Sequence, residues 1–331
     1  MSGIKILGTG TYLPERVATN EDFAKIVETS DEWIRTRTGM SQRRFSQGEP
    51  TWYMGAMAAR QAVEEAGINP GEIGLIIASS VSPDYAFPSQ SCMIQRELGA
   101  VGSMTIDVNC ACSGFVYGMD MARMYLAFGD VKYAVVVGCE NLTKFVDYSD
   151  RSTCVLFGDG AAAAVVECAP GGMYSSFLSA DGNGAKSMAC RYAPPHNAFI
   201  DEARKDIPDG LPVTQGPYMA MDGKEVYKFA TKAMPEAIEK ALGKLGMKPE
   251  ELDVIIPHQA NIRIIETAAQ KSGLPMDKMI INIDRYGNTS STTIPLAMDE
   301  AIRSGRLKRG DKLCLVGFGA GLTYGAVVFE Y

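Results

Sequence analysis

Three residues of the chain have the types that thioester chemistry requires: a cysteine, a histidine and an asparagine. Cys112 lies where a strand-like run, 104–108, gives way to a helical pattern of apolar residues from Phe115 to Leu126. A cysteine in the first turn of a buried helix is exposed to the positive end of the helix dipole, which lowers the thiol pKa. This position predicts a thiolate nucleophile, although Cys112 could equally be a small core side chain.

A second cysteine, Cys110, lies two residues earlier and before the predicted helix, so the dipole argument favours Cys112. The other cysteines are scattered and form no CxxC pair, which gives no indication of a zinc site or a redox pair. We therefore expect no metal site. We also expect reduced thiols that pack as small hydrophobic side chains.

The chain has only two histidines, and they differ in context. His258 directly follows the apolar run 252–257, at the carboxyl end of a predicted strand, where catalytic groups gather in α/β folds. His196 lies in a proline-rich loop. His258 is therefore the candidate for a Cys–His pair. Asn288 follows a glycine in a polar turn after a predicted strand at 280–283, and alone it indicates only an ordinary Gly-Asn turn.

The elements that must position these residues are suggested by an internal repeat. The stretch 67–77 resembles 246–256, with five identities in eleven positions at an offset of 179. Repeats of this kind indicate duplicated structural units, and the helix–turn–strand order indicates sheets covered by helices. We predict two α/β halves, 1–178 and 179–331. The stretch 186–217, with prolines and mixed charges, is predicted to be a long surface loop.

The composition excludes several classes of function. The chain has 331 residues, a net charge of −7 and no basic stripe with aromatic residues, which argues against nucleic-acid binding. No apolar run reaches the roughly 18–20 residues that span a bilayer, and the N-terminus lacks a signal-peptide pattern. We expect a cytoplasmic protein with no membrane insertion. The glycine-rich run 317–325 lacks dinucleotide-binding spacing and instead suggests a tight turn beside a ligand oxygen.

Four motifs together resemble the signatures of the β-ketoacyl-acyl-carrier-protein synthase III family, within the thiolase-like superfamily. They are Ala111–Phe115, Pro257–Asn261, Gly287–Ser290 and Gly317–Gly319. The resemblance implies a thiolase-like five-layered αβαβα fold, built from two duplicated halves, and a homodimer. It also implies acyl-CoA and malonyl-acyl-carrier protein as substrates, without a cofactor. Further matches occur in family order at 29–34, 36–39, 87–89 and 157–160.

The resemblance implies a role for each matched position. Cys112 would carry the acyl group, His258 and Asn288 would act on the malonyl thioester, and the backbone N–H groups of Cys112 and Gly319 would form the oxyanion hole. The remaining implied positions are Trp33, Arg37 and Arg151 for coenzyme A; Phe87 from the partner subunit, Leu142, Phe157 and Met221 for the acyl pocket; and Lys228, Arg263 and Lys271 for acyl-carrier-protein docking.

The sequence departs from the family pattern at a few positions. Ala320 replaces a glycine that is common in the glycine-rich turn, Tyr324 replaces a common tryptophan, and Cys110 is less usual. The alternative within the superfamily is a condensing enzyme or acyltransferase of specialised, polyketide-like metabolism. Two further alternatives lie outside the superfamily. One is a cysteine hydrolase, which has no use for Asn288, and the other is a catalytically inactive binding scaffold.

Overall fold

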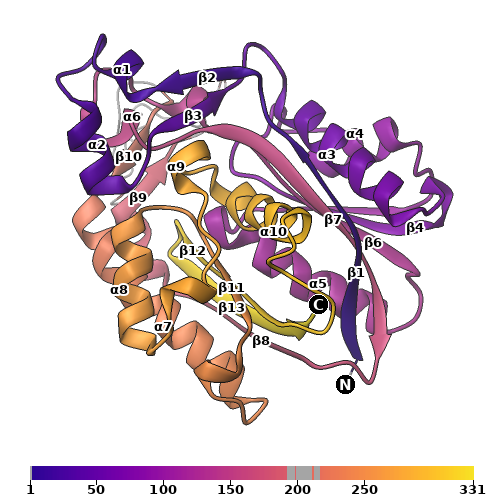
Figure 1. The fold of residues 1–331 in the computed structure, drawn as a ribbon. Coiled ribbons are helices and arrows are strands. Elements are labelled where there is room, and N and C mark those ends of the chain that lie inside the picture. The colour runs from indigo at the N-terminus through magenta and orange to yellow at the C-terminus, as the bar shows by residue number, and fades with distance from the viewer. Residues whose placement is uncertain (1, 192–197, 199–210, 212–216) are drawn as a thin grey trace.

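The computed structural model describes residues 2–191, 198, 211 and 217–331. Its larger sheet has five strands in the order β1-β7-β6-β4-β5, visible on the right of Figure 1. Strand β4 runs parallel to both of its neighbours, whereas β7 runs antiparallel to both of its own. The strands of this sheet are β1 (Ser2–Tyr12), β4 (Ile73–Ser79), β5 (Met104–Val108), β6 (Tyr133–Asn141) and β7 (Asp159–Pro170).

The second sheet has four strands in the order β11-β12-β13-β8. Strands β11 and β12 are parallel, and the other two pairings are antiparallel. These strands are β8 (Tyr174–Ala180), β11 (Val254–Pro257), β12 (Lys312–Gly319) and β13 (Thr323–Glu330). Two short hairpin-like sheets pair β2 (Arg16–Thr19) with β3 (Gln42–Phe45), and β9 (Met188–Cys190) with β10 (Met219–Met221).

Helices complete five layers around these sheets (Figure 1). Helices α5 (Gly114–Ala127) and α10 (Thr293–Arg303) lie between the sheets, in a core that takes apolar side chains from both. Helices α3 (Thr51–Ala66) and α4 (Gln90–Leu98) pack on the outer face of the larger sheet. Helices α7 (Gly223–Gly243) and α8 (Ile262–Ser272) pack on the outer face of the smaller one. The predicted αβαβα fold is confirmed.

The distribution of apolar residues around a helix matches the layer in which the helix lies. Helix α5 is apolar nearly all round, as expected for a helix enclosed between two sheets. Helix α8 buries only one face, with Ile264 and Ala268 among its buried residues, and exposes the other. The remaining helices are short: α1 (Asn20–Phe23), α2 (Asp31–Thr38), α6 (Arg151–Cys154) and α9 (Ile283–Tyr286). No helix in the described part of the chain is both long and apolar enough to cross a bilayer.

The repeat in the sequence corresponds to a repeated local structure. Gly67 and Gly246 both adopt the left-handed conformation, with φ of 65° and 66°. Each is followed by a 3₁₀ turn, at Pro70–Glu72 and Pro249–Glu251, and then by a parallel strand. The predicted boundary after residue 178 falls inside β8, which belongs to the second sheet. We therefore propose that the halves divide between β7 and β8.

The two halves also support each other's turns through paired glycines. A Cβ atom at Gly138 of β6 would lie 2.6 Å from the Ser291 carbonyl oxygen, in the turn before α10. A Cβ at Gly317 of β12 would lie 3.1 Å from Ser113 Cα, in the turn before α5. These glycines are related by the repeat offset. Each lets a strand of one half approach the turn that begins the central helix of the other.

Two predicted local features differ in the structure. The predicted strand at 280–283 is wrong: Met279 makes only an isolated bridge to Ile255, and α9 begins at Ile283. The Gln259 side chain explains this, because it bonds the Ile280 carbonyl and the Asn282 N–H in place of a strand partner. Within the predicted loop 186–217, residues 188–190 form β9. Most of that loop, including His196, lies outside the described residues.

We predict that Gly138→Ala destabilises the fold, because its new Cβ meets a backbone oxygen that cannot rotate away. Overpacking of this kind typically costs about 1–3 kcal/mol in the free energy of unfolding. Urea denaturation followed by circular dichroism measures the change. Gly243→Ala is the matched control, since nothing lies within 4 Å of its added Cβ. Equal unfolding midpoints for the two variants would contradict the close approach.

Candidate active site

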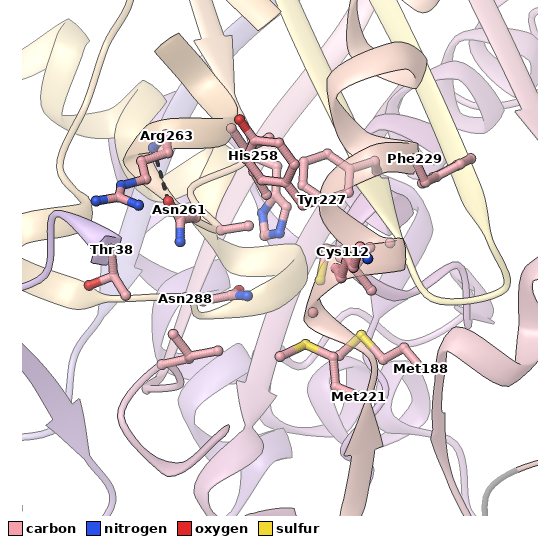
Figure 2. Close-up of a pocket in the computed structure, with 18 of the residues that line it drawn as sticks. Thr38, Cys112, Met188, Met221, Tyr227, Phe229, His258, Asn261, Arg263 and Asn288 are labelled. Carbon is pink, nitrogen blue, oxygen red and sulfur yellow. Dashed lines mark hydrogen bonds between the residues drawn. The ribbon is translucent and has the colours of Figure 1, made fainter. Parts of the chain in front are cut away.

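Two cavities meet at Cys112 (Figure 2). The larger, of about 640 Å³, is also lined by His258 and Asn288, so the structure brings the three predicted catalytic residues together. The smaller, of about 410 Å³, extends from Cys112 past Leu142. Cys110 lines neither cavity, which decides between the two candidate cysteines on geometry.

Cys112 is held in a tight turn directly before α5. It lies in the 3₁₀ turn Ala111–Ser113, and Ala111 has a φ of 46°. Gly319, at the end of β12, packs against this turn so closely that a Cβ there would lie 2.5 Å from the Cys112 backbone nitrogen. Only glycine fits at this position. The backbone segments that were predicted to form an oxyanion hole are therefore adjacent.

The environment of the thiol differs from the sequence prediction. Burial raises the pKa of Cys112 to about 12, with the nearby Glu140 carboxylate adding to the effect. The predicted lowering by the helix dipole is wrong, because the cost of desolvating a thiolate exceeds the stabilisation from one helix end. The free thiol is thus protonated at neutral pH.

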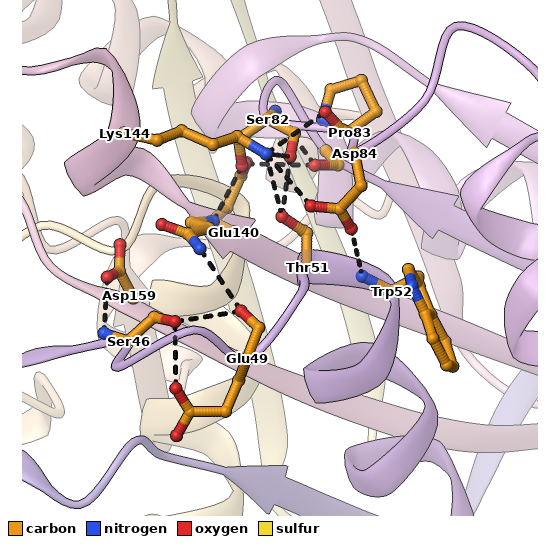
Figure 3. Close-up of polar contacts among 12 residues, drawn as sticks. Ser46, Glu49, Thr51, Trp52, Ser82, Pro83, Asp84, Glu140, Lys144 and Asp159 are labelled. Atoms are coloured by element: carbon orange, nitrogen blue, oxygen red, sulfur yellow. Dashed lines mark hydrogen bonds and ion pairs between the residues drawn. The ribbon is translucent and has the colours of Figure 1, made fainter.

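The Glu140 carboxylate lies in a buried polar network (Figure 3). It accepts hydrogen bonds from Ser82 Oγ at 2.6 Å and Ser291 Oγ at 3.0 Å, and burial raises its pKa. Lys144 Nζ donates to the Ser82 carbonyl at 2.7 Å. The network joins the loop after β4 to the turn that precedes α10 and follows Asn288.

His258 follows β11 directly, as predicted, and is 1% exposed. Its backbone N–H donates to Val316 O at 2.9 Å, and its Nδ1 lies 2.7 Å from Thr293 Oγ1. The ring packs edge-on against Phe318 with 5.1 Å between centroids. Burial lowers the pKa of His258 to about 3, so the imidazole is neutral. Because Thr293 occupies Nδ1, Nε2 is the ring nitrogen that remains for a substrate in the cavity.

Asn288 is held by both its backbone and its side chain. Its N–H donates to Leu156 O at 2.9 Å, and its Oδ1 accepts the Ser290 N–H at 2.8 Å. Ser290 has a φ of 49°, a left-handed conformation in the tight turn that follows Asn288. Since Oδ1 is occupied, the Nδ2 amide is the group that can donate to a ligand. Asn288 Nδ2 and His258 Nε2 are therefore the two nitrogens that remain for a ligand in the cavity that Cys112 also lines (Figure 2).

The residues predicted for coenzyme A lie together at the mouth. The guanidinium carbons of Arg37 and Arg151 lie 5.2 Å and 4.9 Å from the Trp33 ring centroid. Trp33 and Arg37 line the larger cavity. Arg151 stacks directly on the indole and donates to Glu28 O, so an adenine between the two would have to displace the guanidinium.

The predicted acyl-pocket residues separate into three positions. Leu142 lines the smaller cavity, Phe157 lines both, and Met221 lines only the larger. Phe87, predicted to act from a partner subunit, is 86% exposed and lines neither. Met188 lines both cavities and was missed. It is brought there by pairing with Met221 between β9 and β10, which the loop-like sequence did not signal.

The predicted docking cations are also divided. Lys228 and Arg263 line the larger cavity, but Lys271 lies at the far end of α8, where it donates to Thr231 O. Lys224 lines the cavity and was missed. Its spacing of four residues from Lys228, on one helix, was the signal that could have found it. Among the described residues, no group of three or more His, Cys, Asp and Glu side chains is arranged to hold a metal ion.

Comparison with known proteins identifies the family. The sequence model of 3-oxoacyl-[acyl-carrier-protein] synthase III matches residues 106–182, and that of its C-terminal part matches residues 242–331. A β-ketoacyl-[acyl-carrier-protein] synthase III from Clostridium acetobutylicum is 46% identical over 100% of this chain and 99% of its own. The chain belongs to the β-ketoacyl-acyl-carrier-protein synthase III family.

Solved structures agree with this assignment. The 3-oxoacyl-[acyl-carrier-protein] synthase III of Aquifex aeolicus is 42% identical, with a TM-score of 0.90 over 99% of this chain and 100% of its own. The priming β-ketosynthase of the R1128 polyketide biosynthetic pathway is 33% identical, with a TM-score of 0.88 over 99% and 96%. The same fold is therefore found in a 3-oxoacyl-[acyl-carrier-protein] synthase III and in a priming β-ketosynthase of a polyketide pathway.

Two departures from the synthase III pattern have simple structural explanations. Ala320 does not adopt a positive φ, so its position does not require glycine; the left-handed backbone lies at Gly321, with a φ of 136°. Tyr324 packs edge-on against Phe229 at 5.5 Å and bonds Glu236 at 3.4 Å. Neither departure alters the side chain of His258 or that of Asn288.

We predict that alkylation of Cys112 by iodoacetamide becomes steadily faster as pH rises from 6 to 9. The thiol pKa of about 12 lies above this range, so the thiolate fraction rises roughly tenfold per pH unit. His258 stays neutral throughout and adds no inflection. Peptide mass mapping of Cys112 against time measures the rate. A plateau near pH 7 would instead indicate a preformed thiolate–imidazolium pair.

We also predict that Gly319→Ala lowers the rate of Cys112 acylation. Its Cβ would push the β12 backbone away from the Cys112 nitrogen and separate the two N–H donors. Loss of one oxyanion donor typically costs about 10²–10³ in rate. Stopped-flow or quenched-flow mass measurement of the acyl-enzyme gives the rate constant. The neighbouring Ala320→Gly should acylate at nearly the normal rate, and an equal loss in both variants would contradict this role.

Proposed function

We propose that this protein is a β-ketoacyl-acyl-carrier-protein synthase III that condenses an acyl-CoA primer with malonyl-acyl-carrier protein and so initiates type II fatty acid biosynthesis. The observation that carries the proposal is that Cys112, the neutral imidazole of His258 and the amide of Asn288 line one cavity at its junction with a second, where the latter two side chains can supply two N–H donors. A hydrolase would need a base and a water site. These two donors instead suit the stabilisation of an enolate.

In the first half-reaction, Cys112 Sγ attacks the thioester carbonyl of acyl-CoA. The resulting oxyanion accepts hydrogen bonds from the backbone N–H groups of Cys112 and Gly319. The carbonyl–sulfur bond to coenzyme A then breaks, and the proton lost by Cys112 leaves on the coenzyme A sulfur. The acyl chain occupies the smaller cavity past Leu142, and the pantetheine arm occupies the larger one.

In the second half-reaction, the malonyl thioester enters through the larger cavity. His258 Nε2–H and Asn288 Nδ2–H donate to its carbonyl oxygen, so that negative charge can gather there as the carboxylate leaves as carbon dioxide. The enolate carbon attacks the acyl-Cys112 carbonyl, the bond to Sγ breaks, and Sγ takes a proton from solvent. These steps need no metal or redox cofactor.

The surface supports the proposed partners. Strand β5 is an edge strand, and beside it Phe87 and Val101 are 86% and 87% exposed. Pairing with a second copy would cover this edge and place Phe87 in the partner's acyl pocket, as the homodimer proposal requires. At the mouth, Lys228 and Arg263 suit an acidic carrier protein, with Lys271 farther along α8. A cytoplasmic location remains a prediction from the sequence.

A second candidate function is priming of a polyketide-like pathway. The observation that favours it is the 33% identity over nearly the whole length to the R1128 priming β-ketosynthase. The chemistry at Cys112 would be the same. The two functions differ in the carrier protein and in the primer that the smaller cavity accepts.

The function is tested by the intact mass of the carrier protein after reaction. The enzyme is mixed with malonyl-carrier protein and equimolar acetyl-, isobutyryl-, butyryl- and octanoyl-CoA. We expect a β-ketoacyl-carrier protein whose mass gives the length of the preferred primer. Repeating the assay with carrier proteins from fatty-acid and polyketide systems separates the two candidates. Unchanged malonyl-carrier protein beside acylated Cys112 would instead indicate a transferase with another acceptor.

We predict that His258→Ala stops condensation but leaves acylation of Cys112 within about tenfold of normal. The imidazole donor acts on the malonyl carbonyl, and loss of such a group typically costs about 10²–10⁴ in rate. Release of carbon dioxide from malonyl-carrier protein and acyl-enzyme mass report the two halves separately. If acylation disappeared together with condensation, the assignment of His258 to the second half-reaction would be wrong.

A further inference from the structure

The hydrogen bond between His258 and Thr293 leaves Nε2 for a substrate, and it also bears on which ring nitrogen carries the proton. His258 Nδ1 and Thr293 Oγ1 are 2.7 Å apart, and both residues are 1% exposed. In a neutral imidazole one ring nitrogen carries the proton and the other is an acceptor, and the partner of each nitrogen selects the tautomer. The Thr293 hydroxyl is therefore placed to decide which nitrogen of His258 is protonated.

The Thr293 hydroxyl has one proton and two acceptors within reach. One is His258 Nδ1, and the other is the Ser290 carbonyl oxygen at 3.0 Å. That carbonyl already accepts the backbone N–H of Thr293, which closes the 3₁₀ turn Ser290–Thr292. The carbonyl is thus satisfied without the hydroxyl. If the hydroxyl turned to that carbonyl instead, Nδ1 would have to carry the ring proton and donate to Thr293 Oγ1, and Nε2 would be left without a proton to donate.

We propose that Thr293 is a positioning residue that donates its hydroxyl proton to His258 Nδ1 and so holds the imidazole in the tautomer protonated at Nε2. This inference rests on the proposed condensation, in which Nε2–H donates to the malonyl carbonyl. The hydroxyl thereby gives His258 the proton placement that the second half-reaction needs before the substrate arrives.

The residue type suits this task. A carboxylate at position 293 would accept a proton from Nδ1, favour the opposite tautomer and stabilise an imidazolium. A hydroxyl can donate instead and leaves the ring uncharged. The same turn also orients the second donor, because Ser290 N–H occupies Asn288 Oδ1 at 2.8 Å and leaves Nδ2 for the substrate. Residues 288–293 thus preset both N–H donors from one short segment.

The test compares Thr293→Val, which keeps the shape and removes the hydroxyl, with Thr293→Ser, which keeps the hydroxyl. We expect the valine variant to lose about 10–100-fold in malonyl-carrier-protein decarboxylation, the range that loss of an orienting partner produces at metal sites. Cys112 acylation by acetyl-CoA should change less than threefold. The serine variant should recover most of the decarboxylation rate. Thermal unfolding checks that both variants fold.

Nitrogen NMR spectroscopy measures the tautomer of His258 directly. In protein labelled with ¹⁵N-histidine, the ring nitrogen shifts distinguish Nε2–H from Nδ1–H, and a His196→Gln variant assigns the two histidines. In the wild type and in Thr293→Ser, we expect His258 to be protonated at Nε2. In Thr293→Val, we expect a larger fraction of His258 to be protonated at Nδ1. A wild-type Nδ1–H tautomer, or undiminished decarboxylation in the valine variant, would overturn the proposal. Failure of the wild type to condense would overturn the proposed function, while the tautomer measurement would still decide the role of Thr293.

Discussion

The structure depends on the burial of three polar reacting groups at the place where the two central helices begin. Cys112 precedes α5, and Asn288 precedes α10 by one turn of chain, with His258 between them at the end of β11. Because all three side chains are buried, a charge on the thiol or the imidazole would be costly, and burial shifts the pKa of both Cys112 and His258 toward the neutral form. Each is oriented by backbone groups and hydroxyls, which fix direction without introducing a countercharge.

The duplicated halves make this burial possible. Gly138 and Gly317 occupy equivalent strands, and each is pressed against the turn that starts the opposite half's helix. A side chain at Gly138 would push β6 away from the turn that follows Asn288, and a side chain at Gly317 would push β12 away from the turn that holds Cys112. The close packing of two similar halves therefore has a chemical consequence, since it brings one half's thiol to the other half's amide and imidazole. The Glu140 network stiffens the same junction through Ser291.

Much of this arrangement could be predicted from the sequence where the signal was local. The strand at 104–108, the helix after Cys112 and the glycine–proline repeat at 67–77 each rest on short-range patterns, and all three appear in the structure. Properties set by tertiary packing could not be predicted in this way. The thiol pKa was predicted in the wrong direction because sequence shows a helix end but not the depth of burial.

The residues that the sequence did not reveal are likewise determined by tertiary packing. Met188 reaches the cavities only through strand pairing inside an apparent loop, and Thr293 matters only because folding places it against His258. The family resemblance supplied Gly319 and the coenzyme A set, which spacing alone would not have identified. It could not show that Arg151 stacks on Trp33, because that contact depends on side-chain conformation.

The central claim is that Cys112 holds an acyl group that a carrier-bound enolate then captures. A single-turnover chase tests it most directly: enzyme acylated with ¹⁴C-acetyl-CoA is freed of excess substrate and mixed with malonyl-carrier protein. The account predicts that the label leaves Cys112 and appears in β-ketoacyl-carrier protein, with one carbon dioxide released for each acyl group transferred. Release of the label as free acetate, or its retention on Cys112 while carbon dioxide forms, would contradict the account.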